Sequence, residues 1–154
     1  MSIFNFEKNQ LVIFPDPHRP YMPLMQFYND ESFEVSNFVA FIFKTGVMTT
    51  EKVQLAVYDE TYNAELAVSN IVTMKSLDKS AQSFFGKVRF DIEFNMIEAT
   101  IYNLVAKFSG YNLHDYTIGF ALDYPKSAYT DPVTRKEATA FVEVYKKEPY
   151  KTWL

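Results

Sequence analysis

The sequence contains no cysteine, and glycine occurs only four times. A chain without cysteine forms no disulfide, carries no thiolate nucleophile and offers no sulfur ligand to zinc. The four glycines complete neither a G-x-G-x-x-G nor a Walker pattern, so no phosphate-binding loop is indicated. Histidine occurs only as His18 and His114, and without a G-x-S-x-G elbow neither points to a Ser-His-Asp triad. We therefore expect no enzyme, no catalytic residue, no cofactor and no metal centre, although loop carbonyls could still hold a calcium ion.

Long apolar runs are also missing. No stretch approaches the ~18 apolar residues that a membrane-spanning helix requires. The first residues show no basic segment followed by an apolar core, as a secretory signal would, and the chain has no Asn-x-Ser/Thr sequon. We expect a soluble protein that is made in the cytoplasm and does not associate with membranes, and a virion released by lysis is compatible with this expectation.

Clustered positive charge is the third absence. The chain has 15 Lys and Arg against 19 Asp and Glu, for a formal net charge of −4. The two signs are interleaved, and the longest basic run is Lys146-Lys147. Because a phosphate-binding surface needs clustered basic side chains, we expect no nucleic-acid partner.

What the sequence does contain is a strong period-two pattern. Apolar and charged residues alternate from Lys87 to Phe94, which predicts a strand with one buried and one solvated face. Similar alternation or short apolar runs predict further strands at residues 11–14, 38–43, 53–57, 66–74 (interrupted at Asn70), 118–124 and 141–145. Turn-forming residues separate these segments, as in Asp59–Asn63. A chain of 154 residues with 48% hydrophobic residues can form one domain, residues 1–154. We predict an all-β, antiparallel β-sandwich of seven to nine strands, Ig-like or jelly-roll.

One segment breaks the strand pattern. Between residues 96 and 108 apolar residues recur at spacings of three and four, which predicts a short amphipathic α-helix over 96–108. Asn95 with Glu98 resembles a capping box, and Ser109-Gly110 supplies a stop signal. The alternative is two short strands separated at Asn103.

Two carboxylates on the clearest predicted strand have a spacing that catalysis could use. Asp91 and Glu93 lie on one face about 7 Å apart, a spacing compatible with an inverting glycosidase. Lys87 and Arg89 share that face, however. A working acid needs burial to raise its pKa, so we interpret these four residues as an exposed charged row.

Aromatic residues are unusually frequent. Fifteen Phe, eleven Tyr and one Trp make up 18% of the chain. Phe141 and Tyr145 alternate with Val142 and Val144, so that strand has two apolar faces, and both must be covered. Either the core is simply rich in aromatic residues, or some of the rings contact a partner, as tyrosines in interfaces do.

Two further kinds of segment suggest contacts. The Pro-rich loop at residues 15–23 carries Arg19 and Tyr21 and is either a stiff contact arm or an ordinary connection. Both terminal tails are apolar, and such ends are buried either in their own domain or in a neighbouring subunit. The candidate partner-binding residues are Arg19, Tyr21, Phe141, Tyr145, Tyr150 and Trp153.

The sequence therefore favours a non-enzymatic structural protein that docks on partner subunits in a homo- or hetero-oligomeric assembly. By analogy with cysteine-free sandwich domains, a phage virion accessory component is expected, such as a capsid decoration protein or a tail or fibre adaptor. The alternative is a carbohydrate-binding module, in which exposed tyrosines on one face stack on sugar rings. An enzyme is the third and least favoured hypothesis.

Overall fold

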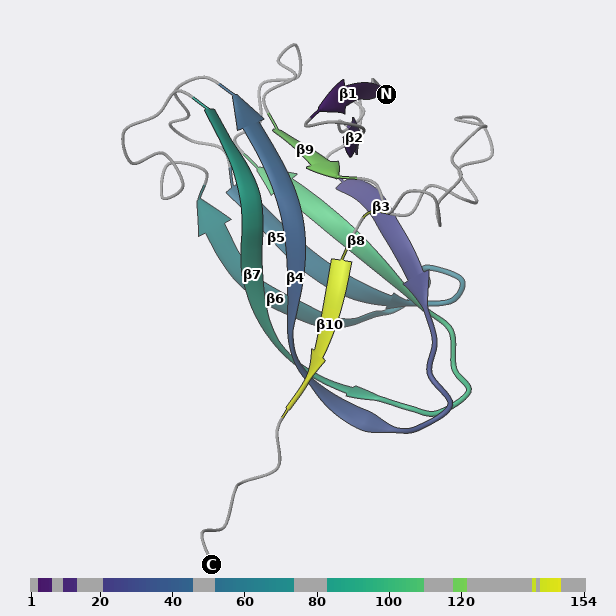
Figure 1. Ribbon diagram of the computed structural model, residues 1–154. Helices are drawn as coiled ribbons and strands as arrows, with labels where there is room; N and C mark the ends of the chain where they lie inside the picture. The colour runs from purple at the N-terminus through teal and green to yellow at the C-terminus, as the bar shows by residue number, and fades with distance from the viewer. Residues whose placement is uncertain are drawn as a thin grey trace, which may run out of the picture.

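The computed structural model describes residues 3–6, 10–13, 21–45, 52–73, 83–109, 118–121, 140 and 142–147. All regular structure in these ranges is β-strand (Figure 1). The strands are β1 (Ile3–Phe6), β2 (Gln10–Ile13), β3 (Tyr21–Phe27), β4 (Phe33–Thr45), β5 (Lys52–Asp59), β6 (Glu65–Thr73), β7 (Ser83–Met96), β8 (Tyr102–Ser109), β9 (Ile118–Ala121) and β10 (Val142–Lys146).

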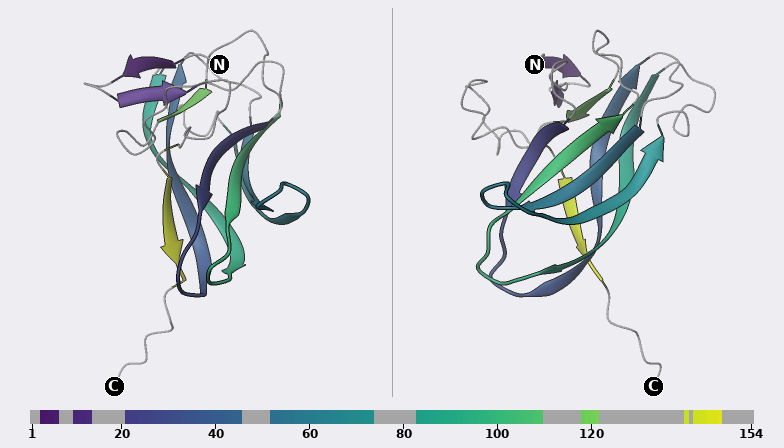
Figure 2. Two further views of the ribbon diagram at one scale, coloured as in Figure 1. Left: turned by 90° about the vertical axis from the view of Figure 1, so that its right-hand side faces the viewer. Right: turned by 180° about the vertical axis from the view of Figure 1, so that it is seen from behind.

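The strands form two antiparallel sheets that face each other as two layers (Figure 2). The six-stranded sheet has the order β1-β2-β9-β4-β10, with β7 also paired to β4. In that sheet β7 follows one edge of β4 from Phe33 to Thr45, while β10 and β9 share the other edge. The four-stranded sheet has the order β3-β8-β5-β6. The prediction of an all-β, sandwich-like fold with antiparallel sheets is thus confirmed.

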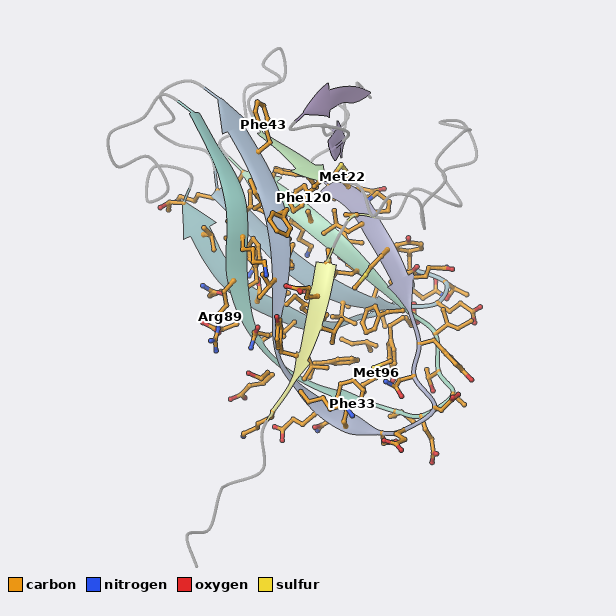
Figure 3. All side chains as sticks on the ribbon, viewed as in Figure 1. Met22, Phe33, Phe43, Arg89, Met96 and Phe120 are labelled. Atoms are coloured by element: carbon orange, nitrogen blue, oxygen red, sulfur yellow. The ribbon has the colours of Figure 1, made fainter. Side chains whose placement is uncertain are left out.

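The core lies between the sheets and is rich in aromatic rings. Phe38, Phe90 and Phe120 are completely buried. Phe94 packs edge-to-face on Tyr102 with ring centroids 4.9 Å apart, an arrangement that adds stability beyond area burial. Figure 3 shows Met22 and Phe120 near one end of this core and Met96 near the other.

Hydrogen bonds connect the two layers at both lateral sides. On one side the Asn70 side chain of β6 accepts a hydrogen bond from the Asp91 N–H of β7 at 2.8 Å. On the other, the Ala140 N–H donates to the Leu24 carbonyl of β3 at 2.7 Å, two residues before β10 enters the six-stranded sheet. These bonds hold the lateral edges of the sandwich together.

The predicted strand segments are confirmed wherever the structure describes the residues, but the described residues contain ten strands, more than the seven to nine predicted. The clearest predicted strand lies in β7, and the segments predicted near residues 11, 38, 53, 66, 118 and 141 lie in β2, β4, β5, β6, β9 and β10. Asp59–Asn63 contains the predicted turn, in which the Tyr62 N–H donates to the Asp59 carbonyl at 3.2 Å.

The predicted helix over residues 96–108 is wrong. Met96 ends β7, residues 97–101 form a turn, and β8 begins at Tyr102. The spacing of three and four arises because β8 is buried on both faces, so apolar residues fall at odd and even positions alike. The Glu98 N–H donates to the Ser32 hydroxyl at 2.8 Å instead of starting a helix. The alternative break at Asn103 is also wrong, because Asn103 lies within β8.

Candidate functional site

The outer face of the six-stranded sheet is charged where β7 crosses it. The side chains from Lys87 to Glu93 on this face are exposed, and Arg89 points away from the core (Figure 3). Arg89 Nε lies 2.6 Å from the Asp91 carboxylate, and the Lys87 ammonium lies 3.4 Å from Glu143. The prediction of an exposed charged row is confirmed, and the Asp91 carboxylate is paired with Arg89 at the surface.

The outer face of the four-stranded sheet has a different character. On β5, Val53, Leu55 and Val57 belong to the core, so the alternate residues Gln54 and Ala56 face outward. Paired residues of neighbouring strands share a face, and Val68 and Ile71 of β6 pair with Ala56 and Gln54.

These two aliphatic side chains are 42% and 55% exposed, respectively. Val68 and Ile71 therefore lie on the surface at positions where a solvated sheet would carry polar groups. We call this surface the outer apolar face.

A hollow of about 650 Å³ adjoins this face between β3, β5, β8 and the turn after β5. Its volume lies within the range of about 300–1,000 Å³ typical of ligand sites. We call it the tyrosine hollow because three tyrosines surround it. Its described lining residues are Tyr21, Pro23, Tyr58, Tyr62, Val105, Lys107 and Phe108.

An ion pair stands at the rim of the hollow. The Lys107 ammonium on β8 contacts the Glu65 carboxylate on β6, and the Tyr58 hydroxyl donates to the same carboxylate oxygen at 2.9 Å. The hydrogen bond from Lys107 lowers the pKa of Glu65, and the same bond raises the pKa of Lys107. Lys107 Nζ also lies 5.6 Å from the centre of the Tyr58 ring. The charged groups thus satisfy each other, and neither is poised to transfer a proton.

The turn between β5 and β6 presents the third tyrosine. Tyr62 has a φ of 62°, in the left-handed region that a non-glycine residue occupies at a cost. The turn is fixed by Asp59, whose carboxylate accepts the Asn63 N–H at 2.7 Å and whose own N–H donates to the Ala64 carbonyl at 3.1 Å. These bonds fix the backbone at Tyr62, and the centre of its ring lies 6.1 Å from the centre of the Tyr58 ring.

The side chain of Asn103 on β8 is hydrogen-bonded to the backbone of this turn. Its side-chain Nδ2 donates to the carbonyls of Asp59 and Glu60, both at 2.9 Å, and the residue is fully buried. Its Oδ1 has no hydrogen-bond partner. A buried amide with only its donors satisfied is unusual, and here those donors tie the Tyr62 turn to the sheet.

Tyr21 and Tyr62 bring two further phenol groups to the lining of the hollow. Neither the Tyr21 nor the Tyr62 hydroxyl makes a hydrogen bond to any described residue. Burial raises the pKa of Tyr62, and the neighbouring Tyr21 adds to this effect. The Tyr62 hydroxyl therefore stays protonated at neutral pH and can donate or accept a hydrogen bond.

The structure places the sequence-predicted contact residues apart. Tyr21 lies at the tyrosine hollow, 44% exposed. Tyr145 is 43% exposed on β10 of the other sheet, where its hydroxyl donates to Glu143 at 3.2 Å. The remaining candidates, Arg19, Phe141, Tyr150 and Trp153, lie outside the described residues.

Sequence reasoning missed most of the hollow. Tyr58, Tyr62 and Lys107 were not among the predicted contact residues, nor were Val68 and Ile71. The available signal was the predicted turn Asp59–Asn63, which has one tyrosine directly before it and another inside it. The pairing of β5 with β8, which adds Lys107, joins residues about fifty positions apart and has no local signature.

Within the described ranges no three His, Cys, Asp or Glu side chains are grouped so that they could hold a metal ion. No helix in those ranges is long and apolar enough to cross a membrane. Comparison of the chain with protein-family models, with curated proteins and with solved structures finds no match in any of the three.

Proposed function

We propose that the chain is a non-enzymatic docking domain that binds partner protein subunits through the outer face of its four-stranded sheet. The observation that carries this proposal is the exposure of Val68 and Ile71 beside the tyrosine hollow. Covering an aliphatic side chain that is half exposed contributes about 1 kcal/mol, and interface cores are enriched in tyrosine and depleted of charge.

The contrast between the two sheets supports this choice of face. The outer row of β7 is charged from Lys87 to Glu93 and needs no cover there. Across the outer apolar face, by contrast, Ala56 and Val105 are buried and the exposed side chains include Val68, Ile71 and Tyr21. Exposed aliphatic and aromatic side chains on one sheet face favour a protein-binding site.

The assembly that we propose is a homo- or hetero-oligomer of the virion type, with this chain as a decoration, tail or fibre-adaptor component. The support is analogy: small cysteine-free sandwich domains often serve such roles. An Ig-like or jelly-roll strand arrangement is part of the same proposal. Arg19, Phe141, Tyr145, Tyr150 and Trp153 are further candidate contacts on sequence grounds.

Sedimentation velocity and native mass spectrometry of the purified chain test the proposal. We expect concentration-dependent self-association, or co-sedimentation with a candidate host particle, in the micromolar range. The double substitution Val68→Lys with Ile71→Lys should abolish it and should leave the fold intact, because both side chains are exposed.

Ile97→Lys is the matched control, since Ile97 is 58% exposed in the turn between β7 and β8, away from this face. A chain that remains monomeric and does not co-sediment with the particle overturns the proposal. So does association that the double variant leaves unchanged.

The second candidate function is a carbohydrate-binding module. The observation in its favour is the set of three tyrosines around one hollow, since aromatic rings stack on sugar faces. A glycan array probed with the purified chain tests it. Binding that is lost on substitution of Tyr62 supports the module, and an array without signal removes it.

A further inference from the structure

We infer that the partner subunit is a second copy of this chain, and that its residues 148–154 dock in a hollow between β4, β6 and β7. The inference rests on the proposed docking function and names the partner. Three observations support it: the strand edges around this hollow, the charge in it and the point at which the chain leaves β10.

The hollow has a volume of about 510 Å³ and is distinct from the tyrosine hollow. Residues 66–68 of β6, 91–93 of β7 and 34–36 of β4 line it together with Lys147, and we call it the edge hollow. Leu66 and Val68 are 46% and 42% exposed, so its β6 wall is apolar and open to solvent. Val68 also belongs to the outer apolar face, so the two surfaces are continuous.

Two strand edges border the edge hollow. Among the described residues, β6 pairs only with β5 and β7 pairs only with β4. No backbone pairing joins β6 to β7 in that part of the chain, and the side chain of Asn70 bridges them. The edge of a strand presents backbone N–H and C=O groups that its own sheet leaves unpaired, and an extended polypeptide can pair with them. The edge hollow therefore suits a peptide, because a sugar cannot continue a ladder of backbone hydrogen bonds.

The charge in the edge hollow favours a cation from that peptide. Of the three carboxylates that line it, those of Glu34 and Asp91 are in ion pairs at the surface. Glu93 is exposed and makes no ion pair with any described residue. The peptide should thus carry a basic residue beside large apolar residues that cover the β6 wall.

Residues 148–154 of this chain meet both requirements. They read Glu-Pro-Tyr-Lys-Thr-Trp-Leu, so Lys151 supplies the cation, and Tyr150 and Trp153 supply large apolar groups of the kind that anchor interfaces. They lie outside the described residues and begin directly after Lys147, which itself lines the edge hollow. A segment of suitable composition therefore starts at the hollow.

The direction of β10 favours a second copy over the chain's own segment as the occupant. β7 and β10 are both antiparallel to β4, so they run parallel to each other on its two sides (Figure 1). The Lys147 N–H donates to the Glu34 carbonyl at 2.8 Å, and the register partner of Glu34 on β7 is Asn95. At Lys147 the chain has therefore already passed the level of Glu93, and the residues that follow would have to reverse to enter their own hollow.

Two copies related by a two-fold axis near Lys147 satisfy this geometry. Seven extended residues reach about 23 Å, so the segment of one copy enters the hollow of the other only if the two exits lie close together. Because Lys147 lines the hollow that receives the other copy's segment, exit and entry adjoin, and the exchange can be reciprocal.

The test is a charge exchange between two variants of the full chain, measured by sedimentation velocity. Glu93→Lys and Lys151→Glu should each weaken the dimer about tenfold, because like charges then meet. An equimolar mixture of the two variants should dimerise as tightly as the parent, since each hollow then receives the opposite charge from the other copy. Glu31→Lys is the control, because Glu31 is also exposed without an ion pair among the described residues but does not line the hollow. It should leave dimerisation unchanged.

Trp153 provides a second measurement, because it is the only tryptophan of the chain. Its fluorescence should be shielded from acrylamide at concentrations at which the chain is dimeric, and accessible after dilution to the monomer. Trp153→Ala should weaken the dimer at least tenfold.

A parent chain that is monomeric by sedimentation overturns the inference, as does a mixture of the two charge variants that dimerises no better than either alone. Fluorescence of Trp153 that is shielded equally in the monomer would assign the hollow to the chain's own segment, and it also overturns the inference.

Failure here is distinguishable from failure of the docking function. Co-sedimentation with a host particle by a chain that is monomeric on its own keeps the docking face and removes the inference. A dimer that requires Glu93 and Trp153 but tolerates Ile71→Lys keeps the edge hollow and removes the outer apolar face as the docking surface.

Discussion

The side chain of Asn70 on β6 caps a backbone N–H of Asp91 on β7, with Oδ1 and N 2.8 Å apart. The two residues belong to different sheets, so this bond joins the two layers at their edges. Asn70 can reach across because β6 changes register there: Gln54 pairs with Ile71, whereas Ala56 pairs with Val68. Such a bulge turns a side chain in a direction that a regular strand would not allow.

Replacement of Asn70 by Ala should lower the free energy of unfolding by about 0.5–1 kcal/mol. The Asp91 N–H loses its acceptor, but water can partly replace it because the bond is exposed. Urea denaturation measures the change. Asn95→Ala, at an exposed position of the same strand β7, is the control and should stay within about 0.5 kcal/mol of the parent. Equal effects of the two substitutions would show that the cap contributes nothing.

Replacement of Asn103 by Ala should be more costly. It removes both donors from the carbonyls of Asp59 and Glu60 in a fully buried setting, and we expect a loss of about 2–3 kcal/mol. Asn63→Ala, in the exposed part of the turn, should be nearly neutral for stability. A fully stable Asn103→Ala chain would contradict the bracing role.

Substitutions in the aromatic core should lower the free energy of unfolding by more than those described above. Phe38 of β4 and Phe90 of β7 are register partners, and both are completely buried. Phe38→Ala or Phe90→Ala should each lower the free energy of unfolding by about 3–5 kcal/mol, through lost burial and the cavity left behind. Guanidinium denaturation checks this, with Ile97→Ala as the surface control. A loss below 1 kcal/mol would mean that the site collapses around the cavity.

Strand positions were predictable because their signal is local. The alternation in β7 reflects one buried and one solvated face, and the structure shows that division from Lys87 to Phe94. The interruption that was predicted at Asn70 coincides with the bulge. The error at residues 96–108 has a local origin as well. When both faces of a strand are covered, periodicity carries no information, and β8 is covered on both.

The candidate site was predictable only in part, because strand pairing creates it. Tyr21 was identified from its place beside the prolines. Lys107, which pairs with Tyr21 across β3 and β8, lies in the segment 96–108 that the sequence pattern predicted to be a helix. Its position beside Tyr21 was therefore not predictable. Tyr62 owes its position to a left-handed φ, which no sequence pattern indicates for a tyrosine. Long-range register and local strain are therefore what sequence reasoning could not supply.

The ion pair at the hollow gives the stability of the protein a dependence on pH. The pKa of Glu65 is lowered from 4.5 in the folded chain, chiefly by the hydrogen bond from Lys107. Its stabilising contribution is therefore complete above pH 4.5 and is lost as the pH falls through the lowered pKa. The pKa of Lys107 is raised from 10.5, so its contribution is complete below pH 10.5 and is lost as the pH rises through the raised pKa.

Glu65→Gln should accordingly lower the free energy of unfolding by about 0.5 kcal/mol at pH 7, since both partners are partly exposed to solvent. The difference from the parent should shrink as the pH falls below 4.5, because the parent carboxylate then becomes protonated as well. Urea denaturation at a series of pH values measures both curves. Glu31→Gln, an exposed carboxylate without an ion pair among the described residues, should give a curve parallel to that of the parent. If the difference in free energy of unfolding between Glu65→Gln and the parent stays constant below pH 4.5, the ion pair does not stabilise the fold through its charge.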